Sequence, residues 1–120
     1  MKTHGSHLLL DVWLLEEAGP ELVARIQNYV REHFTVVVEA EKRFEPFGIT
    51  AVQILSESHF TIHTYPEHRY ISMDLYICEM GIDMDRVRRE LLALMKVDSS
   101  QASFHLRGHR APAPEKDACL

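Results

Sequence analysis

The chain has only two cysteines, no excess of basic residues and no long apolar run. Cys119 is the penultimate residue, so we expect no structural disulfide and treat Cys78 as a free thiol. The formal net charge of -5 argues against a nucleic-acid partner, because binding phosphates requires a basic surface. No apolar stretch is long enough to span a bilayer, which argues against a membrane protein.

The N-terminal segment also lacks the pattern of a secretory signal, since its short apolar run is interrupted by Asp11. We therefore expect a cytoplasmic protein. The chain has 120 residues, of which 46% are hydrophobic and 26% charged, and this is the balance of a soluble globular protein. We predict one domain over residues 1–110 and a disordered tail over residues 111–120.

Hydrophobic periodicity predicts two helices and six strands. One helix is expected to begin at Pro20 and the other at Asp83, because proline suits the first turn and aspartate suits the N-cap. The predicted strands cover residues 7–15, 35–41, 49–55, 59–65, 70–78 and, as a short last strand, 103–107.

This order of elements, with short turns between the central strands, predicts antiparallel pairing. Two helices packed on one face of such a sheet give an α+β fold, a two-layer α/β sandwich. The other face is only half polar, because Asp74, Tyr76 and Cys78 alternate with apolar residues along their strand. Such a face can carry a site or pair with a second copy of the chain.

Residues 55–67 are unusually polar for a strand-rich core, and the pattern alone leaves three interpretations open. The first is a pair of half-exposed strands whose polar side chains face water. The second is a metal site built from His59, His63 and His68, which we disfavour because a strand separates the first two widely. The third is a serine hydrolase, which is disfavoured because the Gly-x-Ser-x-Gly elbow is absent.

Residues 57–67 read Glu-Ser-His-Phe-Thr-Ile-His-Thr-Tyr-Pro-Glu. This segment resembles the signature of the short prokaryotic S-adenosylmethionine decarboxylases, which reads Glu-Ser-His, two residues, Ile-His-Thr-Trp-Pro-Glu. The similarity extends upstream to Arg43-Phe44 and Pro46-Phe47-Gly48, and downstream to residues 74–78. It covers most of residues 1–107.

The resemblance implies that the chain cuts itself at the Glu57–Ser58 bond into a β chain, residues 1–57, and an α chain, residues 58–120. It also implies that Ser58 becomes a pyruvoyl cofactor, which serves as the electron sink when an amino-acid-type substrate loses CO2. The expected product is decarboxylated S-adenosylmethionine for spermidine synthesis. Family members form homodimers, so we expect one here.

The same resemblance assigns roles to three further side chains. His63 is expected to be the base of the processing step, and Cys78 the proton donor during decarboxylation, since a thiol keeps its proton near neutrality. Thr50 stands where the family has a serine that helps processing. In a straight strand Ser58 and His63 point to opposite faces, so we predict a local distortion at Glu57–Ser58 that lets them meet.

Substrate binding is expected to involve Phe44 on the adenine, Tyr65 in place of the family's tryptophan, and Glu67 on the ribose hydroxyls. The chain departs from the family pattern beside these positions, at His68-Arg69 and at Glu79. These departures leave a pyruvoyl-dependent decarboxylase of arginine or ornithine as the alternative. A third hypothesis is a non-enzymatic binding relative.

Overall fold

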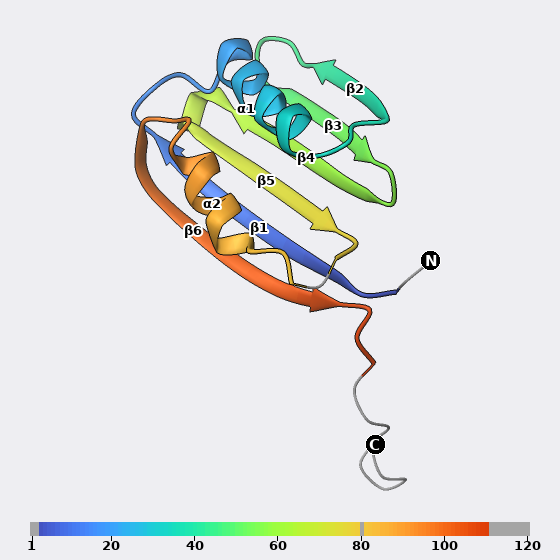
Figure 1. Ribbon diagram of the computed structural model, residues 1–120. Coiled ribbons are helices and arrows are strands. Elements are labelled where there is room, and N and C mark those ends of the chain that lie inside the picture. The colour runs from blue at the N-terminus through green and yellow to red at the C-terminus, as the bar shows by residue number, and fades with distance from the viewer. Residues whose placement is uncertain (1–2, 80, 111–120) are drawn as a thin grey trace, which may run out of the picture.

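The computed structural model describes residues 3–79 and 81–110, and within them the elements follow the predicted order (Figure 1). The predicted disordered tail lies outside the described residues. The strands are β1 (Gly5–Leu14), β2 (Val38–Arg43), β3 (Ile49–Leu55), β4 (Ser58–Tyr65), β5 (Tyr70–Ile77) and β6 (Val97–Arg107). The helices are α1 (Pro20–His33), α2 (Met84–Leu92) and the short 3-10 helix η1 (Pro66–His68).

The six strands form one antiparallel sheet in the order β2-β3-β4-β5-β1-β6. Both α-helices lie across the same face of this sheet (Figure 1). The predicted α+β two-layer sandwich is therefore confirmed. The two helices also begin where the sequence predicts, at Pro20 and directly after the N-cap Asp83, whose side chain accepts a hydrogen bond from the Arg86 N–H.

The core lies between the sheet and the helices because alternate strand residues are apolar. In β4, Phe60 and Ile62 are at most 1% exposed and belong to the same core as Leu22 and Ile26 of α1. The intervening residues point to the uncovered side of the sheet, which we call the open face. On the four central strands the open face carries His7, Leu9, Asp11, Trp13, Thr50, Val52, Ile54, His59, Thr61, His63, Tyr65, Tyr70, Ser72, Asp74 and Tyr76.

Two strand predictions need correction. The last strand is much longer than the predicted 103–107 segment, because β6 pairs with β1 along the whole length from Leu14↔Val97 to Gly5↔Arg107. Its first half is polar, so backbone pairing rather than apolar alternation holds it there. Strand β2 begins at Val38 instead of residue 35, and all its residues are exposed, as suits an edge strand.

A two-residue turn joins β3 to β4 at one end of the sheet. Leu55 pairs with Ser58, which leaves only Ser56 and Glu57 in the turn. Ser56 has a φ of 57°, and tight hairpins of this length require a positive φ. The distorted residue thus lies one position before the predicted place, with Glu57 between it and the Glu57–Ser58 bond.

Candidate active site

Three of the predicted site residues meet at the β3–β4 turn. Cys78 directly follows β5, and its backbone N–H donates a hydrogen bond to Ser58 Oγ at 2.9 Å. Its thiol donates a second hydrogen bond to the Glu57 carbonyl oxygen at 3.0 Å. All three residues line a hollow of about 260 Å³ beside the end of α1.

This arrangement places a hydroxyl nucleophile beside the carbonyl group of the preceding residue. A donor on a carbonyl oxygen stabilises the negative charge that develops there when a nucleophile adds to the carbon. The Cys78 thiol occupies that donor position on Glu57. The sequence predicts a role for Cys78 only in the later decarboxylation, because it does not give the register between β4 and β5 that sets Cys78 beside Glu57.

Thr50 and His63 form a separate pair on the open face. They lie opposite each other in β3 and β4, and Thr50 Oγ1 is 3.0 Å from His63 Nδ1. Five residues of strand separate His63 from Ser58, a distance of about 17 Å, and the two positions face opposite sides of the sheet. The predicted contact between Ser58 and His63 is therefore not formed within one chain.

A row of aromatic rings crosses the open face at the end of the sheet away from Ser58. Tyr65 stacks on Tyr70 with centroids 5.3 Å apart, and Tyr70 stacks on Trp13 at 5.1 Å. Burial, followed by its hydrogen bond to Asp11 at 2.6 Å, raises the pKa of Tyr70. Tyr65, at the end of the row, is 43% exposed.

Phe44 and Glu67 lie at this same far end of the sheet. Phe44 is half exposed and lines a hollow of about 550 Å³ together with Pro66 and Arg69. Glu67 lies in η1, where its carboxylate is 3.9 Å from the His68 ring and open to solvent. The residues predicted to bind substrate thus gather at one end of the sheet, to which His63 and Thr50 are nearer, whereas Ser58 and Cys78 lie at the other end.

A solved structure, the adenosylmethionine decarboxylase from Aquifex aeolicus, shares this fold with a TM-score of 0.77 at 24% identity. The match covers 97% of this chain and 100% of the other. Residues 6–108 match the family model for S-adenosylmethionine decarboxylase. The chain belongs to this family, as the signature around Ser58 predicts.

Curated relatives agree with that assignment. The protein from Thermosipho melanesiensis is 31% identical over 113 residues, covering 90% of this chain and 87% of the relative. The protein from Oceanobacillus iheyensis is 38% identical over 92 residues, covering 69% of this chain and 70% of the relative. Both are named S-adenosylmethionine decarboxylase proenzyme. Within the described residues, no helix is long and apolar enough to cross a membrane.

Proposed function

We propose that this chain is a self-processing S-adenosylmethionine decarboxylase proenzyme that cuts itself between Glu57 and Ser58. The observation that carries the proposal is the double contact of Cys78, which binds the Ser58 hydroxyl through its N–H and the Glu57 carbonyl through its thiol. Nucleophile, electrophile and donor are thereby preassembled at the bond to be cut. The relatives' name, proenzyme, supports the same step.

Cleavage proceeds by rearrangement and elimination. Ser58 Oγ adds to the Glu57 carbonyl carbon, the C–N bond breaks, and the amide becomes an ester with a free Ser58 amine. Removal of the Ser58 α-proton then breaks the Cβ–Oγ bond, which releases Glu57 as a carboxylate and leaves a carbon–carbon double bond at residue 58. Water replaces the amine, ammonia leaves, and residue 58 ends as a pyruvoyl group.

The residues around Ser58 fit such a cofactor. Ser58 is the first residue of β4, so cleavage makes it a chain end that the strand ladder still holds in place. The pyruvoyl ketone supplies an electron sink for the electron pair that departing CO2 leaves behind. Cys78, which lines the same hollow, holds a proton at Sγ for delivery to the product.

S-adenosylmethionine is the substrate that the relatives' names favour over arginine or ornithine. Tyr65 suits an adenine ring because its exposed face is already fixed by stacking on Tyr70. The solvent-exposed Glu67 carboxylate suits the two ribose hydroxyls, to which it can accept hydrogen bonds. The product would be decarboxylated S-adenosylmethionine, the donor for spermidine synthesis.

The functional unit in this proposal is a homodimer joined through the open faces. Leu9 and Ile54 are 39% and 41% exposed there, which leaves apolar area for a second copy to cover. A two-fold axis running across the strands would set the Ser58 end of one sheet against the Tyr65 end of the other. Such a dimer supplies His63 and Tyr65 to a site whose Ser58 belongs to the partner.

Denaturing mass spectrometry of the purified protein tests the cleavage. Wild type should give fragments 1–57 and 58–120, the second lighter by one ammonia than the same fragment with an N-terminal serine. Ser58→Ala should stay whole. Cys78→Ser, which keeps a donor for the Glu57 carbonyl, should be cut faster than Cys78→Ala. A whole wild-type chain after prolonged incubation under native conditions would refute the proposal.

Release of CO2 tests the substrate. Processed wild type should release CO2 from S-adenosylmethionine and not from arginine or ornithine at the same concentration. Release of CO2 from arginine or ornithine, but not from S-adenosylmethionine, would refute the proposed substrate and favour the alternative one. It would leave the proposed cleavage step unaffected.

A further inference from the structure

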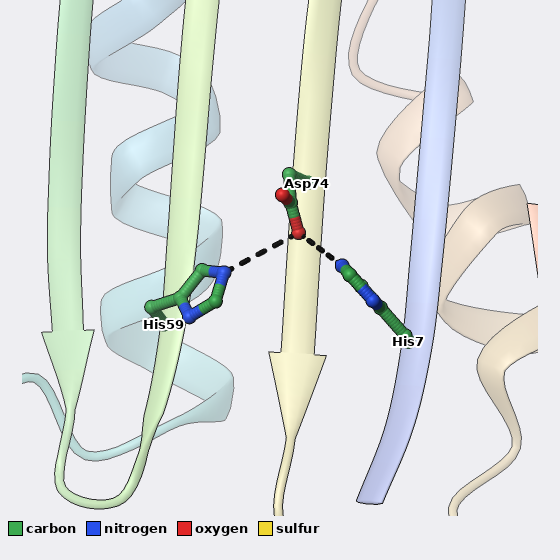
Figure 2. A group of neighbouring side chains, drawn as sticks. All are labelled: His7, His59 and Asp74. Atoms are coloured by element: carbon green, nitrogen blue, oxygen red, sulfur yellow. Dashed lines mark hydrogen bonds and ion pairs between the residues drawn. The ribbon is translucent and has the colours of Figure 1, made fainter. Parts of the chain in front are cut away.

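Three side chains outside the cleavage contacts converge on the open face (Figure 2). His7 of β1 and His59 of β4 both lie opposite Tyr76 in register, one on each side of β5. Asp74, two residues earlier in β5, points between the two rings. Its Oδ1 is 2.5 Å from His7 Nε2 and 3.4 Å from His59 Nε2, and the three ligand atoms lie within 4.8 Å of one another.

We propose that His7, His59 and Asp74 bind one divalent transition-metal ion of the zinc, cobalt or nickel class. Two imidazole nitrogens and one carboxylate oxygen suit these ions, whereas Mg²⁺ prefers an all-oxygen shell. Three protein ligands leave a coordination position for water. The sequence alone offers His63 and His68 as companions of His59, but the sheet register brings His59 to His7 and Asp74 instead.

One of the three distances between ligand atoms already matches that of an occupied site. With bonds of about 2.0–2.1 Å, neighbouring ligand atoms in a tetrahedral site lie roughly 3.4 Å apart. The His59–Asp74 distance already has this value. The His7–Asp74 distance is 2.5 Å and must open by about 0.9 Å when an ion binds.

The site is also partly preorganised. The Tyr76 ring stacks on His59 with an interplanar angle of 12° and meets His7 edge-on at 77°, so both imidazoles rest against the same aromatic ring. The His7 side chain is only 12% exposed, whereas His59 and Asp74 are 40% and 35% exposed. The ion would thus be anchored at the largely buried His7, with His59 and Asp74 on the side of the open face that the proposed dimer partner covers.

Arg107 competes with the metal for His7. Its Nη1 lies 2.9 Å from His7 Nδ1, and because a guanidinium only donates, that nitrogen accepts and Nε2 carries the hydrogen that it donates to Asp74. A metal at Nε2 moves the hydrogen to Nδ1, where it would face the guanidinium. Arg107 is exposed at the end of β6 and must swing away. Removing it should therefore tighten metal binding.

Isothermal titration calorimetry of the chelator-treated protein tests the site, with Zn²⁺ and Mg²⁺ as probes. We expect one Zn²⁺ per chain and no response to Mg²⁺. His7→Ala and Asp74→Asn should each weaken Zn²⁺ binding at least tenfold, and Arg107→Gln should strengthen it. His68→Ala, which removes an exposed histidine away from the cluster, is the matched control and should bind as wild type.

Further measurements separate zinc binding from self-cleavage and from any failure of a variant to fold. Ser58→Ala should bind Zn²⁺ as wild type does, and Cys78→Ser should too, since neither residue is a ligand. In the wild-type protein, Zn²⁺ should shift the imidazole NMR signals of His7 and His59 before those of the other histidines. Unchanged affinity in folded His7→Ala and Asp74→Asn, equal binding of Mg²⁺, or shifts confined to other histidines would overturn the proposal.

Discussion

Co-expression of two inactive variants, Ser58→Ala and His63→Ala, tests whether the processing base comes from a second copy of the chain. Ser58 and His63 of one chain lie about 17 Å apart on opposite sides of the sheet. A general base must come within roughly 3 Å of the proton it removes, directly or through one water. We therefore expect both variants to stay uncut when expressed alone, for different reasons. Ser58→Ala lacks the nucleophile, and His63→Ala lacks the base.

In a mixed dimer one of the two sites is complete. The His63→Ala chain retains Ser58 and receives His63 from its partner, while the other site lacks both groups. Random pairing of equal amounts makes about half of the dimers mixed. About half of the His63→Ala chains, and no Ser58→Ala chains, should then be cut.

Different affinity tags on the two variants let denaturing mass spectrometry report which chain is cut. Each variant expressed alone is the control. Mixing the two purified variants shows whether their subunits exchange after synthesis or form mixed dimers only during co-expression. If the His63→Ala chain is cut no more in the mixture than alone, His63 does not act across an interface. If it is cut fully when alone, His63 is not the base at all.

Three further predictions concern the fold. Phe60→Ala should cost about 3–5 kcal/mol in chemical denaturation, because Phe60 is 1% exposed in the core. The hydrogen bond from Arg31 holds the pKa of Glu39 below its ordinary value. In chemical denaturation at neutral pH, the free energy of unfolding of wild type should therefore exceed that of Glu39→Gln by less than about 1 kcal/mol. This difference should vanish as the pH falls through the lowered pKa, because the carboxylate is then protonated. Tyr29→Phe removes the hydrogen bond that chiefly lowers the pKa of Glu90, so NMR titration should find that pKa raised toward its ordinary value.

The sheet was predictable where apolar and polar residues alternate, and less so where they do not. Strands β4 and β5 begin and end within one residue of the prediction because one side of each is buried. The first half of β6 gives no such signal, since residues 98–101 are polar and exposed. Its position follows from pairing with β1, a long-range interaction that leaves no local pattern in the sequence.

The candidate site shows the same limit. The alternation of side chains along a strand correctly predicts that Ser58 and His63 face opposite sides of the sheet. The short signature around Ser58 is enough to name both as candidate site residues. This alternation does not give the register between strands, which decides that Cys78 meets Glu57 and that His59 meets Asp74. The expected distortion occurs at Ser56, but it closes a hairpin and does not bring Ser58 to His63.

The positions of the predicted residues along β4 constrain how a substrate can bind. Ser58 and Tyr65 occupy the two ends of this strand, which are about 23 Å apart. A small molecule held at Tyr65 of one chain cannot also reach residue 58 of that chain. Either Tyr65 has no part in binding, or the adenine of a substrate at residue 58 stacks on the Tyr65 of a second copy. The second arrangement also delivers His63 to the same place, because His63 lies two residues before Tyr65 on the same open face. One reversal of strand direction across the dimer thus satisfies both requirements for position along β4.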